Sequence, residues 1–238
     1  YALNRTALPE LMSFMQPYGS HYKITSRPTP LIQGLYPDYH TGIVGYDLNY
    51  ALAEAELKNA TFNGQRVWDT GFNLTIPCTD QSAQYFFQAI QSFFAQLSTY
   101  DGRSPALPHF TINVQSVTWS DYLNYWLTFK LPIVVMNWLA DFADAHSFMR
   151  AFAHSQGDFS SLQNYTASNG WGSRKDELIN LALKTPDGPE RAAMYAELEQ
   201  IYIANCPSVP LTQTMYRKFL KYWVRGWYDN PLNPSAYY

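Results

Sequence analysis

Charged residues are scarce in this 238-residue chain, at 15% of the sequence, and the formal net charge at pH 7 is −3. There is no basic stripe, so nucleic acid is not an expected partner. No apolar run is long enough to span a bilayer, and no signal-peptide pattern is present. The chain opens at Tyr1 rather than at a methionine, and we expect it to be a piece of a longer polypeptide.

Cysteine is almost absent, with Cys78 and Cys206 as the two examples. They are compatible with one disulfide outside the cell, but their spacing cannot show whether the thiols lie within bonding distance, so both states stay open. Four Asn-x-Thr sequons begin at Asn4, Asn59, Asn73 and Asn164. Their number mildly favours a secreted, glycosylated protein.

Catalytic and metal-binding patterns are also missing. The sequence has no nucleophile elbow, no Walker loop and no zinc-ligand spacing, and its five histidines lack the spacing of a metal site. We therefore expect no catalytic residue, no metal ligand and no cofactor. Asp141, Asp144 and His146 are close enough in sequence to form an acid/base set, which leaves an enzyme as the remote alternative.

Aromatic residues, in contrast, are abundant, at 17% of the chain with 19 tyrosines and 7 tryptophans. Each tyrosine or tryptophan offers a flat apolar body with a polar tip, which suits a recognition surface. A compositional bias of the lineage would produce the same excess, and the two explanations stay open.

Hydrophobic periodicity predicts an α/β fold. Residues 71–78 and 110–117 alternate between apolar and polar side chains, as strands do, and residues 133–136 form a continuous apolar run typical of a buried strand. Residues 83–97 and 119–129 have helical spacing. This β-α-β-α-β order predicts a mostly parallel sheet with right-handed crossovers and flanking helices.

The other expected elements are helices at residues 1–16, 47–57, 146–152, 173–183 and 190–199, with an irregular segment at residues 17–45. Asp47 and Ser173 are expected to cap the helices that they begin.

The most informative stretch follows the third predicted strand. A buried strand that runs into a polar turn and then a helix places the turn at the carboxyl end of a sheet, where open α/β folds bind ligands. There Trp138 could stack on a ligand and Asp141 could anchor a cation. In the alternative interpretation, Trp138 belongs to the core and Asp141 caps the following helix.

Residues 137–145 resemble the Gly-Trp-x-Ala-Asp-Tyr-x-Asp-Pro motif of extracytoplasmic solute-binding proteins of the oligopeptide/dipeptide type, family 5. Trp138, Ala140, Asp141 and Asp144 match this motif, whereas Asn137, Phe142 and Ala145 depart from it. A second, more specific resemblance to the same family lies in the Arg-x-x-x-Tyr-x-x-Leu-x-x-Ile pattern from Arg191 to Ile201, with Pro207, Pro210 and Leu211 after it.

The resemblance implies a periplasmic-binding-protein type II-like fold. Residues 1–208 would form the second α/β lobe, and residues 209–238 would cross the hinge back to the first lobe, whose bulk is absent from this chain. The implied function is that of the extracellular substrate-binding component of an ABC importer, which captures short peptides between two lobes. The partners would be the transporter permease and the missing lobe, with an anchor in a part outside this chain.

The resemblance also implies roles for individual residues. Asp141 would pair with the ligand's amino group, and the backbone from Asn137 through Trp138 to Leu139 would bind the ligand as an added strand does. Met136, which precedes them, completes the expected ligand-binding set. Asp144 is expected to cap the following helix rather than to contact ligand. An oligosaccharide receptor on the same fold and a glycosylated surface scaffold remain the alternatives.

Overall fold

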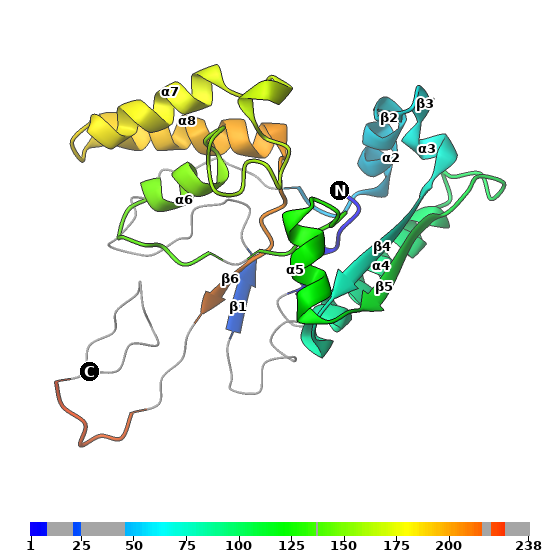
Figure 1. Cartoon of the computed structure of the whole chain (residues 1–238), viewed down its shortest axis with the longest axis horizontal. Helices are drawn as coiled ribbons and strands as arrows, with labels where there is room; N and C mark the ends of the chain where they lie inside the picture. The colour runs from blue at the N-terminus through cyan, green and yellow to red at the C-terminus, as the bar shows by residue number, and fades with distance from the viewer. Residues whose placement is uncertain (9–20, 25–45, 137, 216–219, 227–238) are drawn as a thin grey trace. The chain divides into compact units, whose positions relative to one another are not determined.

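The computed structural model describes residues 1–8, 21–24, 46–136, 138–215 and 220–226 (Figure 1). The chain divides into two compact units, the first made of residues 1–18 and 46–136 and the second of residues 19–45 and 137–238. The assignment of residues 1–208 to one lobe and of 209–238 to a hinge-crossing segment stays a prediction. None of the helices among the described residues is both long and apolar enough to cross a membrane.

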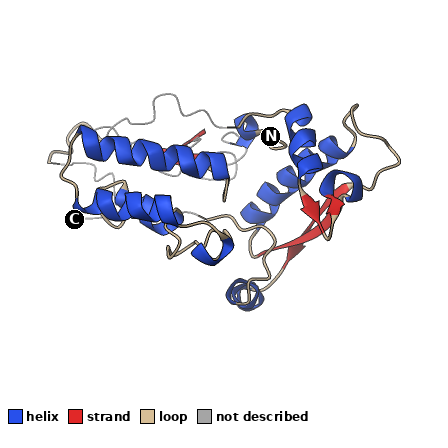
Figure 2. Cartoon of the chain, turned by 90° about the horizontal axis from the view of Figure 1, so that it is seen from above, coloured by secondary structure: helices blue, strands red, loops and turns tan. Residues whose placement is uncertain are grey.

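A parallel pair of strands organises the first unit. β4 (Phe72–Cys78) and β5 (Phe110–Ser116) run in register from Phe72 opposite Phe110 to Cys78 opposite Ser116. α4 (Gln81–Ser98) joins the two strands and packs against both, as a parallel connection requires; Figure 2 shows this pair among helices. The strands and the helix confirm the predictions for residues 71–78, 83–97 and 110–117.

Apolar side chains from four elements hold this unit together. Ala53, Trp68, Leu97 and Phe110 form its buried cluster. The guanidinium of Arg103 is also buried and lies 4.6 Å from the Trp68 ring centroid and 4.2 Å from that of Phe110. The charge is therefore enclosed by aromatic faces, an arrangement that favours a cation.

The third predicted strand, at residues 133–136, is wrong. These residues are assigned to no strand, and among the described residues they take part in no backbone hydrogen bond. Val135 is 36% exposed, so the apolar run is not buried as a two-sided strand would be. A run of apolar residues predicts burial, but a strand needs a neighbour that completes its hydrogen bonds, and the preceding Pro132 has no N–H to donate.

α5 (Trp119–Leu127) confirms the helix predicted at residues 119–129. Its first turn is capped by Thr118, whose hydroxyl accepts a hydrogen bond from the Asp121 amide at 3.1 Å. Between α2 and β4 the chain forms a short hairpin and one further helical turn. These elements are β2 (Thr61–Phe62), β3 (Gln65–Arg66) and α3 (Val67–Thr70).

Two further predictions near the amino terminus need correction. The described part of residues 1–16 contains the 3-10 turn η1 (Arg5–Ala7), so Tyr1–Asn4 are not helical, and residues 9–16 lie outside the described residues. α2 (Tyr50–Asn59) begins later than predicted because Asn49, not Asp47, caps it: the Asn49 side chain accepts a hydrogen bond from the Leu52 amide at 3.0 Å.

A long-range strand pairing was missed. β1 (His21–Ile24) lies in the segment predicted to be irregular, of which residues 17–20 and 25–45 fall outside the described residues. It pairs antiparallel with β6 (Thr212–Met215). The local sequence carries no sign of this strand, since its partner lies almost two hundred residues away in the chain.

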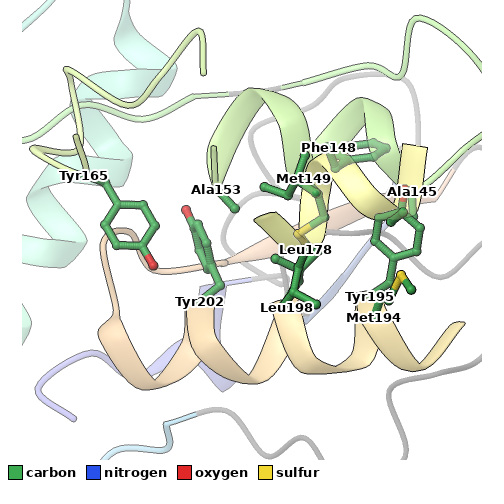
Figure 3. Packing of buried hydrophobic residues seen from close by; sticks show 12 residues of the cluster. Ala145, Phe148, Met149, Ala153, Tyr165, Leu178, Met194, Tyr195, Leu198 and Tyr202 are labelled. Atoms are coloured by element: carbon green, nitrogen blue, oxygen red, sulfur yellow. The ribbon is translucent and has the colours of Figure 1, made fainter. Parts of the chain in front are cut away.

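Three helices form the core of the second unit. They are α6 (His146–Phe152), α7 (Ser173–Lys184) and α8 (Pro189–Asn205), with the 3-10 turn η2 (Ala167–Asn169) before α7. Met149, Leu178 and Leu198, one from each helix, face one another in Figure 3 and are at most 3% exposed. The three helices confirm the predicted ones, but Ser173 is the first helical residue of α7 and forms no capping hydrogen bond.

Candidate functional site

The candidate site is the segment Trp138–Asp144, which we call the ligand segment; it leads into α6 in the second unit. Its first side chain is anchored. The indole of Trp138 meets the rings of Phe152 and Phe159 edge to face, with centroids 6.4 and 5.3 Å apart. Trp138 also packs against the core cluster of this unit. Trp138 is half-buried, so the interpretation that places it in the core holds for the part of its side chain that packs against this cluster.

The backbone next to Trp138 is open. Among the described residues, no hydrogen bond reaches the amide or carbonyl groups of Trp138, Leu139 and Ala140. Leu139 is 66% exposed, whereas Ala140 packs against the core. Unpaired backbone groups beside alternating inward and outward side chains are what an added strand of a ligand requires.

Asp141 is exposed, and no described residue forms an ion pair or hydrogen bond with its carboxylate. Its backbone amide donates to the Ser147 hydroxyl at 3.1 Å, which fixes the backbone but not the charged group. The alternative in which Asp141 caps α6 is wrong, because the N-cap of this helix is Ala145, which has no side-chain cap. Asp144, one residue before the N-cap, accepts a hydrogen bond at its Oδ1 from the amide of His146, the first helical residue, at 2.7 Å. The expected capping role of Asp144 therefore needs correction: its side chain binds the first helical amide from outside the helix and is not the N-cap.

Asp144 also forms an ion pair, with Arg191 of α8, whose Nη2 lies 2.8 Å from Asp144 Oδ1. Burial by itself would raise the pKa of the Asp144 carboxyl. The hydrogen bonds from Arg191 and from the His146 amide, together with the charge of Arg191, outweigh burial and hold that pKa below its usual value. The Asp144 side chain is therefore ionised near pH 7 and paired with Arg191.

His146, the first residue of α6, is buried beside this pair. Its Nδ1 lies 3.3 Å from the Tyr195 hydroxyl. Burial lowers the pKa of His146, and the nearby Asp144 charge only partly opposes this. Burial likewise raises the pKa of Tyr195. Both groups are thus neutral near pH 7, and the site's charged groups are Asp141, Asp144 and Arg191.

The lowered pKa of Asp144 predicts how stability depends on pH. The folded state stabilises the ionised form of the Asp144 carboxyl more than the unfolded state does. The resulting contribution to the free energy of unfolding is complete above the ordinary carboxyl pKa of about 3.9. It is lost as pH falls from there through the lowered folded pKa. We expect the wild type to be more stable than Asp144→Asn near neutral pH, and this difference to shrink below about pH 4.

Urea unfolding between pH 7 and pH 2 measures that difference, because contributions common to both proteins cancel. Asp158→Asn is the matched control. Asp158 is exposed and has no ion pair among the described residues, so its replacement should change stability little. A gap between wild type and Asp144→Asn that stays constant down to pH 2 would show that the ion pair does not set the carboxyl pKa.

The remaining predicted residues are placed as follows. Asn137 lies outside the described residues, and Met136 is half-buried at the end of the first unit. Ser147 and Arg191 were not predicted as parts of the site. Arg191 belongs to the second family motif, but sequence spacing gives no sign that it reaches Asp144, which is 47 positions away.

The four sequons are on or near the surface. Asn59, Asn73 and Asn164 are exposed, and Asn4 is half-buried. Cys78 is buried in the first unit and Cys206 is exposed in the second, and the structure contains no disulfide between these two described residues. Because the cysteines belong to different units, their pairing stays a prediction, as does glycosylation.

Within the described part of the chain, no three or more His, Cys, Asp or Glu side chains come together as metal ligands would.

The ligand segment combines an exposed carboxylate, open backbone groups and apolar neighbours. Such a surface can pair with a cation, hydrogen-bond an extended chain and cover its side chains.

Known proteins resemble this chain in both sequence and fold. The sequence model described as bacterial extracellular solute-binding proteins, family 5 Middle, matches residues 1–160. None of the curated proteins matches the chain. A similar solved structure is the ABC transporter-associated periplasmic binding protein DppA from Helicobacter pylori in complex with the peptide STSA, with a TM-score of 0.65 and 21% identity over 89% of this chain and 36% of that one.

Two more solved structures are similar. The periplasmic oligopeptide-binding protein of Thermotoga maritima, with mannohexaose bound, has a TM-score of 0.61 and 15% identity over 89% of this chain and 39% of that one. The periplasmic oligopeptide-binding protein OppAIV of Borrelia burgdorferi has a TM-score of 0.60 and 18% identity over 90% of this chain and 38% of that one. This chain thus spans little more than a third of these proteins, with a fold of the periplasmic-binding-protein type II class. With the family's sequence model covering two thirds of its residues, the chain belongs to the family 5 bacterial extracellular solute-binding proteins.

Proposed function

We propose that this chain belongs to the extracellular substrate-binding component of an ABC importer, which captures short peptides between two lobes. In this proposal Asp141 pairs with the ligand's amino group. The observation that carries it is the exposed Asp141 carboxylate, without a partner among the described residues, beside the open backbone of Trp138–Ala140. The permease and a first lobe outside this chain are the proposed partners, and attachment to the cell envelope would come from a part outside it.

The chemistry of a peptide ligand matches these groups. An ammonium that enters a closed, dry cleft costs several kcal/mol, of order ~5, unless a carboxylate pairs with it. Hydrogen bonds from open backbone groups recognise any peptide irrespective of its side chains. Exposed apolar residues such as Leu139 and Phe142 can cover varied side chains. The peptide bound in the Helicobacter protein supports this choice of ligand class.

An oligosaccharide is the second candidate ligand. The mannohexaose bound in the Thermotoga protein favours it, and the tryptophans and tyrosines of this chain would suit stacking on sugar faces. Asp141 would then accept hydrogen bonds from hydroxyl groups instead of neutralising a charge. The two candidates differ in how much they depend on the charge of Asp141.

Mass spectrometry of the small molecules that co-purify with the full-length protein, released by denaturation, tests the proposal. A ladder of short peptides with free amino termini is the expected result. Oligosaccharides would replace the peptide proposal with the sugar one. An empty site in protein that self-associates without ligand would contradict both and favour the scaffold function.

A further inference from the structure

Arg191 connects the ligand segment to two helices of its unit. It lies in the first turn of α8 and donates from Nη2 to Asp144 Oδ1 at 2.8 Å and from Nη1 to Asp187 Oδ1 at 2.9 Å. Its Nε donates to the carbonyl oxygen of Ala182, near the end of α7, at 2.8 Å. One guanidinium therefore binds α7, the α7–α8 turn and the last residue of the ligand segment at the same time.

Asp144 in turn is connected to Asp141 by hydrogen bonds of the turn that contains both residues. The Asp141 amide donates to Ser147 Oγ at 3.1 Å, and the Ser147 amide donates to the Asp144 carbonyl at 3.1 Å. The Asp144 amide donates back to the Phe142 carbonyl at 2.8 Å. The Asp141 carboxylate has no partner among the described residues, so what these hydrogen bonds fix is the backbone from which it projects.

The guanidinium of Arg191 has little capacity left for a ligand. Besides the three contacts above, its Nη2 donates to the Tyr195 hydroxyl at 3.1 Å, and its charge lies 4.9 Å from the Tyr195 ring centroid. Four of its five N–H groups thus have protein acceptors, and the side chain is only 14% exposed. Arg191 can act on a ligand through Asp144, but it is not placed as a contact residue.

We propose that Arg191 is a positioning residue for ligand binding, which holds the backbone that carries the Asp141 carboxylate through its ion pair with Asp144. This inference rests on the proposed function for its effect on affinity. The positioning itself is a property of the ligand-free protein, so the two can be tested apart.

A purely electrostatic influence of this ion pair would act differently. Neutralising Arg191 leaves the site more negative and would tighten the binding of a cationic amino terminus, whereas neutralising Asp144 leaves it less negative and would weaken binding. If the pair positions the turn, both changes weaken binding, because either one breaks the same contact. The sign of the Arg191→Gln effect therefore separates the two explanations.

The first readout is amide hydrogen exchange across residues 138–147 in the ligand-free, full-length protein, well below its unfolding temperature. We expect Arg191→Gln and Asp144→Asn to exchange about tenfold faster there than the wild type, since local opening sets exchange. The matched control is Arg174→Gln. Arg174 also joins α7 to α8, through Glu197 at 2.8 and 2.9 Å, but in an exposed pair, and it should leave these amides unchanged.

The second readout is the dissociation constant for a short peptide identified by co-purification. Both Arg191→Gln and Asp144→Asn should raise it by roughly ten- to a hundredfold, the range typical of groups that orient a binding residue. The double variant should be no worse than either single one, because the two residues act as one unit. Arg191→Lys, which keeps the charge but loses the planar fork, should recover part of the affinity.

Unchanged exchange in Arg191→Gln, or tighter peptide binding by it, would overturn the positioning role. If Arg191→Gln does not fold, amide exchange in Arg191→Lys and Asp144→Asn decides instead, and wild-type exchange rates across residues 138–147 in both would overturn the positioning role. A wild type that binds no peptide would contradict the proposed function, while the exchange rates would still decide whether Arg191 holds the ligand segment.

Discussion

Replacing Asp141 with asparagine should weaken the binding of a short peptide with a free amino terminus by roughly a hundredfold. Removing one partner of a desolvated charge pair costs about 2–5 kcal/mol, and about 1.4 kcal/mol corresponds to tenfold in affinity. The folded protein should be almost as stable as before, because Asp141 is exposed and its carboxylate has no partner among the described residues. Isothermal titration and thermal unfolding of the full-length protein measure the two quantities.

Glu177→Gln is the matched control for the lost charge. Glu177 is an exposed carboxylate on α7, and its neutralisation should leave peptide affinity within about twofold of wild type at physiological salt, since exposed charges are screened. Equal losses in Asp141→Asn and Glu177→Gln would mean that net charge, not a specific pair, attracts the ligand. For an oligosaccharide, Asp141→Asn should cost far less than for a peptide, because a neutral hydrogen bond is worth only about 1 kcal/mol.

The largest effect on stability should come from Leu178→Ala in α7, with a loss of about 2–5 kcal/mol in the free energy of unfolding. Leu178 is 3% exposed and belongs to the core cluster shared by α6, α7 and α8 (Figure 3). Its truncation removes apolar burial and leaves a cavity that helices packed on several sides cannot close. Chemical denaturation followed by circular dichroism, which reports these helices, measures the loss.

Leu181→Ala on the same helix is the comparison. It makes the same chemical change at a site that is 52% exposed, so its effect should be within about 0.5 kcal/mol. If the two variants lost equal stability, the helix's intrinsic propensity rather than the three-helix core would account for the effect, and the packing shown for α7 would be contradicted.

The local periodicity of apolar residues predicted much of the fold. Residues 71–78 and 110–117 alternate because one face of each strand packs under α4, and the helices from α4 to α8 carry the spacing that their buried faces impose. Residues 133–136 show the limit of this reasoning, since an apolar run does not reveal whether a neighbouring strand is present. β1 shows the same limit in reverse, because it is defined by its pairing with β6.

The candidate site likewise has features that the sequence predicts and features that depend on how the helices pack. Trp138 and Asp141 stand out because an aromatic ring and a carboxylate follow an apolar run within a family motif. The sequence also indicates that Asp144 contacts the start of α6, because it is two positions before His146, although the N-cap itself is Ala145. The ion pair with Arg191 is not readable, because it depends on how α8 packs against α6 and α7 and joins residues that are far apart in sequence.

The most direct test of the central claim uses one short peptide in two forms, with its amino terminus free or acetylated, titrated into the full-length wild-type protein. Acetylation removes the charge that Asp141 is proposed to neutralise and leaves the backbone groups for the open edge of Trp138–Ala140. The account predicts roughly a hundredfold weaker binding of the acetylated form, since its pairing with a desolvated carboxylate is lost. Equal affinity for the two forms would contradict it and remove Asp141 from the recognition of the ligand.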